Sequence, residues 1–483
     1  MTFTINDEGF LFEIRNIFTL FYPHKKIARQ QPVPGEDGFA MHFDGTAVSL
    51  QGQVGDRAYR KTAAVANREQ AERVLCCMLY EALSDATGLR FQWGILTGIR
   101  PVKMLEKLMG QGLTEEEAAD VLRRDYLVQP EKLTLLRETT RRETAVAALS
   151  TPDSYCLYLA VPFCKTRCSY CSFVSHSIDK AAPLIEPYLE RMCEELRDKA
   201  AMAGQLGLTL RTIYIGGGTP TVLSASQLKR LTDAVCEYFP VDTALEYTCE
   251  AGRPDTIDWE KLQVLKNAGV TRISINPQSM NDEVLCAIGR SHTAKELLDC
   301  YRMARGVGFD CINMDLIAGL PMDTLESHEK TVEQILDLRP ENITIHTLAE
   351  KRASTITAQG GGQYGMSEAE VEEALRFGRE KLEQAGYAPY YMYRQKNTRA
   401  GLENVGYCLP GKEGLYNVFI MNETHSIFAV GAGAVTKLKC ARENRIERVF
   451  NLKYPYEYID RFDEVKERGK AILDFYRRFP PTA

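Results

Sequence analysis

The feature that most constrains the fold is a regular alternation of apolar, β-branched runs with amphipathic helical runs between residues 155 and 349. Six strand-like runs, among them YCLYLAV, TIYIG and CINMDLIAG, are separated by five runs of helical periodicity. Such an alternation produces βαβ units, in which helices cover a parallel sheet. We therefore predict an α/β fold whose central part, residues 151–350, is a partial (β/α)6 TIM-like barrel with ligands at the carboxyl ends of its strands.

Regions with other patterns flank this predicted barrel. Residues 1–65 show short alternating runs and turn signals such as PGEDG, which predict a β-rich piece, whereas residues 66–150 have helical periodicity. We place a boundary near Ser150, which makes residues 1–150 an N-terminal α+β region. Residues 351–483 contain the string QGGGQYG, a capped helix, short strands including GLYNVFIMN, and a final helix. We expect this C-terminal α+β region to close over the open side of the barrel and cover the substrate.

Charge and hydropathy narrow the choice of partners. The formal net charge of -6 gives no general attraction for phosphate backbones, so we expect no nucleic-acid partner. No apolar run approaches the roughly 20 residues of a membrane-spanning helix, and the start MTFTINDEGF has no signal pattern. We expect a cytoplasmic protein with no membrane partner. In that compartment the 14 cysteines are better explained as thiols and metal ligands than as disulfides.

Three cysteines stand at the spacing C-x3-C-x2-C in the string PFCKTRCSYCSF, directly after the first predicted barrel strand. They are Cys164, Cys168 and Cys171. Thiolates suit iron–sulfur clusters, and three of them leave one iron of a cubane open to bind another molecule. A zinc site is the alternative, because His176 could supply the fourth ligand that zinc normally requires.

A glycine run ends the second predicted strand, in the string YIGGGTPTVLS. Glycines at Gly217 and Gly218 would let a ligand approach the backbone closely and receive hydrogen bonds from free N–H groups. A tight strand-to-helix turn would need the same residues. The position of the run, one strand after the cysteine loop, favours a role in ligand binding.

The three-cysteine spacing, with the aromatic Tyr170 before the last cysteine, resembles the signature of the radical S-adenosylmethionine (radical SAM) superfamily. The resemblance implies a radical SAM barrel with a 4Fe-4S cluster on Cys164, Cys168 and Cys171. In that family SAM binds the open iron, and one-electron reduction yields methionine and a 5′-deoxyadenosyl radical.

Longer strings narrow the resemblance. YLAVPFCKTRCSYCSF, GGGTPT, SINPQSM, IGRSH and MDLIAGLP together resemble the oxygen-independent coproporphyrinogen III oxidase (coproporphyrinogen dehydrogenase) family. YYMYRQKN, LENVGY and GAGAVTK further resemble its Bacillus and Clostridium branch, which has an extended N-terminal region. This resemblance implies an oxidoreductase of anaerobic haem biosynthesis that decarboxylates two propionates of coproporphyrinogen III to vinyl groups, giving protoporphyrinogen IX. It implies a tetrapyrrole substrate, a reducing electron donor such as flavodoxin or ferredoxin, and an electron acceptor that the sequence does not identify.

The resemblance also implies the residues that contact SAM. The contacts to a cluster-bound SAM would be Tyr158, Tyr170, Gly217 and Glu250. A second SAM would be contacted by Gly218, Thr219, Gln278, Arg290, Asp315 and Ala349. Each ionisable residue also has an ordinary structural explanation. Glu250 could be a solvated acid at a strand end, Arg290 could form a surface ion pair, and Asp315 could be a turn residue. Family members often carry a histidine at the position of Ala160, so one polar contact is missing here.

Two other classes of protein have sequences similar to this one. Haem-binding chaperones of the same fold show H-N-x-x-Y-W near the tail, where the histidine serves haem iron. This chain has Glu403 in place of that histidine, and Val435 where the chaperones tend to show another. A radical SAM enzyme that modifies or degrades another tetrapyrrole, such as haem, is the third alternative.

A run in the tail could contact the carboxylates of a tetrapyrrole. It contains Tyr390, Tyr391, Tyr393, Arg394 and Lys396. Buried carboxylates need cationic or hydrogen-bonding partners, which this run would supply beside an aromatic surface. The alternative is a strand that packs its tyrosines on the barrel and leaves both cations in solvent.

Overall fold

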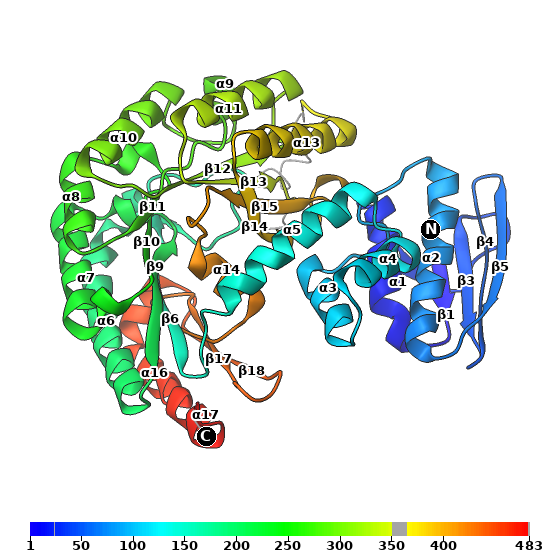
Figure 1. Ribbon diagram of the computed structural model, residues 1–483, viewed down its shortest axis with the longest axis horizontal. Coiled ribbons are helices and arrows are strands. Elements are labelled where there is room, and N and C mark those ends of the chain that lie inside the picture. Colours follow the sequence, from blue (N-terminus) through cyan, green and yellow to red (C-terminus); the bar gives the residue numbers. More distant parts are fainter. Residues whose placement is uncertain (24, 350–364, 482–483) are drawn as a thin grey trace. The chain divides into compact units, whose positions relative to one another are not determined.

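The structure is a computed structural model that describes residues 1–23, 25–349 and 365–481 (Figure 1). The chain forms two compact units. The first unit contains Met1–Thr140 and Met392–Glu403, and the second contains Arg141–Tyr391 and Asn404–Ala483. The boundary between the units thus falls within the helix Pro130–Ala147, before the predicted position near Ser150. The C-terminal region belongs mainly to the second unit. A short tail segment nevertheless belongs to the first.

The first unit begins with a five-stranded sheet of order β2-β1-β3-β4-β5. Its strands are β1 (Thr2–Ile5), β2 (Ala28–Arg29), β3 (Gly38–Phe43), β4 (Ala47–Val54) and β5 (Arg57–Ala64). Its helices are α1 (Leu11–Phe21), α2 (Arg68–Thr87), α3 (Pro101–Gly110), α4 (Glu115–Tyr126) and the start of α5 (Pro130–Ala147). Strands β1, β3 and β4 and helices α1 and α2 share one apolar core.

Helix α1 corrects the β-rich prediction for part of residues 1–65. Its buried residues are Ile14, Ile17, Phe18 and Phe21. These positions are spaced by three or four residues, so they lie on one helical face, which packs into the core of the unit. The remaining strands of this region do form the predicted sheet.

The second unit contains the predicted open barrel. Its eleven-stranded sheet has the order β14-β15-β13-β12-β11-β10-β9-β6-β16-β17-β18. Six neighbouring parallel strands form the centre: β6 (Ser154–Val161), β9 (Thr209–Gly217), β10 (Glu246–Glu250), β11 (Arg272–Ser274), β12 (Ile312–Ala318) and β13 (Asn342–Thr347). They confirm the partial (β/α)6 prediction. Strand β6 is buried along almost its whole length, as expected for a parallel strand covered on both faces.

Helices cover the outer face of this parallel sheet (Figure 1). They are α6 (Ile178–Gln205), α7 (Ala225–Tyr238), α8 (Trp259–Asn267), α9 (Asp282–Ala287), α10 (Ala294–Val307) and α11 (Leu325–Leu338). Several begin at side-chain caps that the sequence places there: Ser224 and Thr293 each form a capping box. The loops that lead from the carboxyl ends of the strands to these helices carry the site described below.

The C-terminal region extends the sheet at both edges. Strand β15 (Glu403–Cys408) pairs antiparallel with β13, and β14 (Ala388–Arg394) lies beyond it. At the other edge β16 (Ser426–Val430) runs parallel to β6, followed by β17 (Val435–Lys439) and β18 (Ile446–Phe450). The predicted covering region thus supplies strands to the barrel itself. The described helices of this region are α13 (Glu368–Gln384), α14 (Leu415–Asn422), α15 (Pro455–Asp460), α16 (Phe462–Gly469) and α17 (Ala471–Arg478).

Helix α14 contradicts the prediction that GLYNVFIMN is a strand. Its first N–H groups donate to the carboxylate of Glu246, from Leu415 at 2.8 Å and from Tyr416 at 3.3 Å. A carboxylate at a helix N-terminus satisfies free donors and complements the helix dipole. Because this cap comes from a strand that is distant in sequence, the local pattern did not reveal it. The string QGGGQYG lies outside the described residues except for its last glycine.

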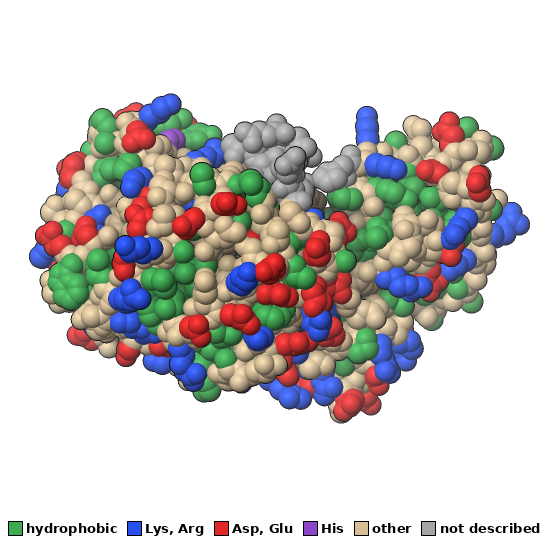
Figure 2. All heavy atoms as spheres, turned by 90° about the horizontal axis from the view of Figure 1, so that it is seen from above, with side chains coloured by type: hydrophobic (Ala, Val, Ile, Leu, Met, Phe, Trp, Pro, Cys, Tyr) green, Lys and Arg blue, Asp and Glu red, His purple; other side chains and the backbone are tan. Residues whose placement is uncertain are grey.

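Two surface properties bear on the predicted partners. On the face shown in Figure 2, acidic and basic side chains are interspersed. This mixture agrees with the small negative net charge of the chain. Across the part of the chain that the structure describes, no helix is both long and apolar enough to cross a membrane.

Candidate functional site

The cysteine loop lies at the carboxyl end of β6. It is closed by the short parallel pair β7 (Phe163–Cys164) and β8 (His176–Ser177). Within the loop the N–H of Cys171 donates to the carbonyl of Cys168 at 3.1 Å, which forms a turn. The N–H of Ser169 donates to the carbonyl of Ile288 at 3.0 Å and ties the loop to the end of α9. The predicted cluster ligands therefore lie where a barrel site is expected.

The surroundings of the three thiols fit an iron–sulfur cluster. All three are free cysteines, and Cys164 and Cys171 are partly exposed. The hydroxyl of Thr219 donates to Cys164 Sγ at 3.5 Å, and a guanidinium nitrogen of Arg253 lies 3.8 Å from Cys168 Sγ. Donors and cations of this kind stabilise the thiolate form that binds iron.

The zinc alternative depends on His176 as the fourth ligand. Within the described ranges, no three His, Cys, Asp or Glu side chains, the three cysteines of the loop included, are grouped so that they could hold one metal ion. His176, the suggested fourth ligand, instead places its ring edge-on to the stacked rings of Tyr454 and Tyr456. The cluster prediction therefore rests on the spacing of the three thiols, which is the number that a cluster with one open iron requires.

The glycine run lies directly against the cysteine loop. Gly217 has φ +107°, a conformation that other residues rarely adopt. A Cβ at Gly218 would lie 2.5 Å from the carbonyl oxygen of Phe163 and 3.0 Å from Cys164 Sγ. Neither position tolerates a side chain, and the close approach brings this backbone to the first cluster ligand. Gly217, Gly218 and Thr219 are therefore adjacent to the predicted cluster.

Three stacked tyrosines line the interior beside Glu250. Tyr158, Tyr214 and Tyr416 form the stack, with ring centroids 4.4 Å apart for Tyr214 and Tyr416. The hydroxyl of Tyr214 donates to Glu250 at 2.6 Å. Burial raises the pKa of Glu250 to about 7. Glu250 is therefore not the solvated acid of the structural alternative, and Tyr214 is a neighbour that the sequence pattern did not identify.

Gln278, which follows β11, lies beside Asp315, which is within the neighbouring strand β12. The N–H of Gln278 donates to the carbonyl of Asp315 at 2.9 Å, and Gln278 has φ +66°. The carboxylate of Asp315 accepts from Asn276 and Asn313, each at 2.8 Å. Burial opposes the charge of Asp315, yet hydrogen bonding and the nearby His346 keep its pKa below the ordinary value. Asp315 is thus an oriented carboxylate rather than a simple turn residue.

Arg290 is hydrogen bonded to Tyr170, another predicted SAM contact. Its Nη2 donates to the hydroxyl of Tyr170 at 2.9 Å, and its Nη1 donates to the carbonyl of Gly252 at 2.7 Å. Its Nε is buried and has no hydrogen-bond partner among the described residues. Burial opposes its charge, but Tyr170 and Cys168 raise its pKa above the ordinary value. Arg290 is therefore not a surface ion pair. Ala349, the last predicted contact, is largely buried just beyond β13.

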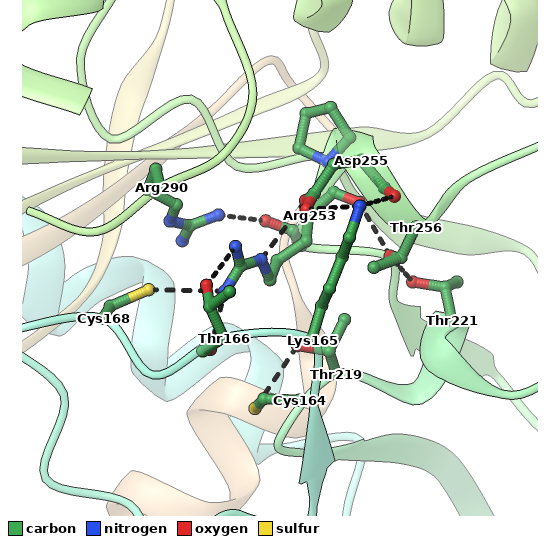
Figure 3. A network of polar contacts seen from close by, with 12 residues as sticks. Cys164, Lys165, Thr166, Cys168, Thr219, Thr221, Arg253, Asp255, Thr256 and Arg290 are labelled. Carbon is green, nitrogen blue, oxygen red and sulfur yellow. Dashed lines mark hydrogen bonds and ion pairs between the residues drawn. The ribbon is translucent and has the colours of Figure 1, made fainter. Parts of the chain in front are cut away.

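The structure adds charged residues that the sequence analysis overlooked. Arg253 and Asp255 follow β10, and Lys165 belongs to the cysteine loop; all three belong to one polar network (Figure 3). Arg253 also donates to both the carbonyl and the hydroxyl of Thr166, each at 2.8 Å. The signal in the sequence is the string AGRPD immediately after Glu250, and it is weak because a charged pair after a strand is common in surface turns.

The tail run has different surroundings from those expected of a substrate site. Arg394 donates to the carbonyls of Leu96 and Gly401 and lies over the ring of Trp93, all within the first unit. Its side chain is almost fully buried. Tyr390 and Tyr391 are also buried. These contacts support the alternative in which Arg394 has a structural role. They differ from that alternative in one respect, because the side chain is buried and not in solvent.

Comparison with known proteins identifies the class to which this fold and site belong. The family model of the Radical SAM superfamily matches residues 158–335. The solved structure of coproporphyrinogen III oxidase (HemN) from Escherichia coli, described as a radical SAM enzyme, aligns with a TM-score of 0.53 at 23% identity. That alignment covers 66% of this chain and 71% of HemN. The chain has the radical SAM fold.

The relatives narrow this class to a family. The oxygen-independent coproporphyrinogen-III oxidase-like protein HemZ of Bacillus subtilis (strain 168) is 35% identical over 484 residues, covering 97% of each chain. The heme chaperone HemW of the same organism is 38% identical over 192 residues, covering 40% of this chain and 49% of HemW, so the match spans about half of that relative. The chain belongs to the HemZ/HemN-like coproporphyrinogen oxidase family. Membership confirms the predicted resemblance and implies a 4Fe-4S cluster and SAM.

Proposed function

We propose that this protein is a radical SAM oxidoreductase that converts two propionates of coproporphyrinogen III to vinyl groups, giving protoporphyrinogen IX in anaerobic haem biosynthesis. The full-length relationship to HemZ, together with the cysteine loop at the carboxyl end of β6, carries this proposal. When bound, the reduced cluster cleaves SAM and supplies a 5′-deoxyadenosyl radical that abstracts hydrogen from substrate. Each propionate then loses carbon dioxide and one electron.

The chain's own residues hold the cofactors in this proposal. Cys164, Cys168 and Cys171 bind the cluster, and the backbone at Gly217 receives the polar end of SAM. Glu250, held by Tyr214 at 2.6 Å, accepts hydrogen bonds from SAM. Further proposed contacts to this SAM are Tyr158 and Tyr170. A second SAM is proposed at Gly218, Thr219, Gln278, Arg290, Asp315 and Ala349.

The reaction also requires partners that exchange electrons. We include a flavodoxin or ferredoxin as the proposed donor to the cluster and a separate acceptor for the electron released by each decarboxylation. The acceptor's chemical class is open. The proposed location is the cytoplasm, where such donors operate.

Glu403 favours an enzyme over a haem chaperone. Its carboxylate accepts from Lys132 and from the indole N–H of Trp93, each at 2.7 Å, and its side chain is 3% exposed. Burial would raise its pKa, but Lys132 lowers it below the ordinary value, so the group stays ionised and paired. A carboxylate engaged in this way does not replace the histidine that the chaperone pattern provides for haem iron.

Product analysis under anaerobic conditions tests the proposal. Reconstituted protein is given SAM and a reductant with either coproporphyrinogen III or haem, and the tetrapyrroles are identified by mass spectrometry. We expect SAM-dependent loss of two carboxyl groups from coproporphyrinogen III, abolished in Cys168→Ser, and unchanged haem. Transfer of intact haem to an apoprotein without decarboxylation would favour the chaperone, and SAM-dependent alteration of haem would favour another tetrapyrrole enzyme.

A further inference from the structure

Arg253 is a buried guanidinium that holds the loop between the first two cysteines. Its side chain is 4% exposed. Nη1 donates to the carbonyl of Thr166 and Nη2 to the hydroxyl of the same residue, each at 2.8 Å. Nη1 also lies 3.8 Å from Cys168 Sγ, and Nε lies 3.3 Å from Asp255. Figure 3 shows this guanidinium directed at the loop from the end of β10.

The charges around the loop do not cancel. Lys165 lies 3.3 Å from Asp255, so this one carboxylate is shared between Lys165 and Arg253. Burial raises the pKa of Asp255, but both cations outweigh it and hold that pKa below the ordinary value, so Asp255 stays ionised. Arg290 adds a further cation beside Cys168. Nearby His292 is buried, and burial lowers its pKa to about 4, which leaves it neutral near pH 7. The cysteine loop therefore faces an excess of positive charge.

We propose that Arg253 is a positioning residue that fixes the cysteine loop and, through its charge, stabilises the reduced state of the cluster. The inference rests on the proposed function only in assuming that Cys168 is a cluster ligand. Reduction adds one negative charge to a group already carrying three thiolates. A buried guanidinium beside one of those sulfurs lowers the free energy of the more negative state, because screening by water is weak there.

Two substitutions of Arg253 distinguish its contact with the loop from the effect of its charge. Arg253→Lys retains the charge and loses the forked contact with Thr166. Arg253→Gln removes the charge and retains one donor. Asp255→Asn removes the neighbouring carboxylate and so increases the positive excess. Arg230→Gln is the matched control, because Arg230 is an arginine on α7 whose ion pair with Glu186 is exposed.

The experiment is a redox titration of the anaerobically reconstituted full-length protein without SAM or substrate, followed by electron paramagnetic resonance, with iron content measured in parallel. We expect Arg253→Gln to shift the midpoint potential to a more negative value and Asp255→Asn to shift it to a less negative value. Arg253→Lys should retain a potential close to wild type but lose iron faster to a chelator. Arg230→Gln should match wild type in both readouts.

Several outcomes would overturn the inference. A wild-type potential in both Arg253→Gln and Asp255→Asn shows that charge at this position does not tune the cluster. A wild-type rate of iron loss in Arg253→Lys removes the positioning role. If Arg253→Gln loses its cluster entirely, the midpoint potential of Asp255→Asn still tests the charge effect, and a shift to a more negative value would contradict it. Because no tetrapyrrole is present, failure to oxidise coproporphyrinogen III leaves this result intact, whereas a wild-type protein without any cluster refutes the proposed function itself.

Discussion

Glu250 and Tyr214 form a hydrogen-bonded pair whose protonation bears on SAM binding. Burial raises the pKa of Glu250 to about 7, and the Tyr214 hydroxyl, 2.6 Å away, lowers it by stabilising the carboxylate. The carboxylate form accepts hydrogen bonds from SAM in the proposed site. Glu250 was identified from a family pattern, whereas Tyr214 was not, because a tyrosine within an apolar strand has no distinctive spacing. The physical partner of a predicted residue thus became visible only in the fold.

We predict that affinity for SAM falls as the pH drops below about 7, by up to about tenfold per pH unit, as Glu250 becomes protonated. Tyr214→Phe should move this midpoint to higher pH, because it removes the hydrogen bond that lowers the pKa of Glu250. Glu250→Gln should flatten the dependence. Equilibrium binding of SAM to the reconstituted protein across pH 6 to 8 checks this. An unchanged midpoint in Tyr214→Phe would contradict the assignment.

Arg394 supports a prediction about stability rather than substrate. Burial lowers its pKa to about 10, and its guanidinium donates to carbonyls of Leu96 and Gly401. Arg394→Ala leaves these carbonyls unsatisfied, so we expect a loss of about 2 to 3 kcal/mol in stability, measured by denaturant unfolding. Lys396→Ala, at an exposed position, should change stability by less than about 0.5 kcal/mol. A stable Arg394→Ala variant with lost turnover would return this residue to the substrate site.

At the scale of elements, the sequence predicted what depends on local pattern. The six central strands follow from apolar runs between helices, and the closeness of Cys164 and Gly218 follows from their positions after neighbouring strands. The position of β16 does not follow, because its parallel pairing with β6 joins segments far apart in the chain. The same reason explains α14, whose N-terminus depends on Glu246. Arg253 was overlooked because the path of the loop, rather than its residue type, brings it to Cys168.

The pairing of β6 with β16 is reinforced by a buried histidine. His425, just before β16, is hydrogen bonded through Nδ1 to Ser150 at 2.7 Å and through Nε2 to Cys156 Sγ at 3.0 Å. Thr212 of β9 also donates to Cys156 Sγ at 2.9 Å. Burial, assisted by the charge of Arg211, lowers the pKa of His425 to about 3. The imidazole is therefore neutral in the folded protein.

This histidine predicts a pH-dependent loss of stability. Its pKa is about 3 when folded and near 6.5 when unfolded, so between these values the unfolded chain binds the extra proton. Above pH 6.5 the contribution vanishes, and below it His425 should cost about 1.4 kcal/mol per pH unit. Unfolding measured from pH 7.5 to 5.5 should show a smaller slope in His425→Gln than in wild type. Ser150→Ala, which keeps the histidine, should retain the slope; equal slopes in all three would contradict the argument.

For the whole molecule, the account depends on one cluster held by three cysteines. We predict about four irons per chain after anaerobic reconstitution, and loss of this iron in Cys164→Ser, Cys168→Ser or Cys171→Ser. Substitution of Cys76, Cys77 or Cys440 should leave the iron in place, because these free cysteines lie outside the loop. Iron and zinc analysis of the purified proteins measures the effect. Tightly held zinc without labile iron would refute the cluster.

The central claim is that a radical generated from SAM removes hydrogen from the propionate β-carbon of coproporphyrinogen III. It is tested most directly with substrate that carries deuterium at those carbons, incubated anaerobically with the reconstituted protein, SAM and a reductant. Mass spectrometry of the 5′-deoxyadenosine then reports the origin of the transferred atom. We predict that deuterium enters 5′-deoxyadenosine in proportion to the vinyl groups formed. Formation of 5′-deoxyadenosine without deuterium, while the propionates remain intact, would contradict the account.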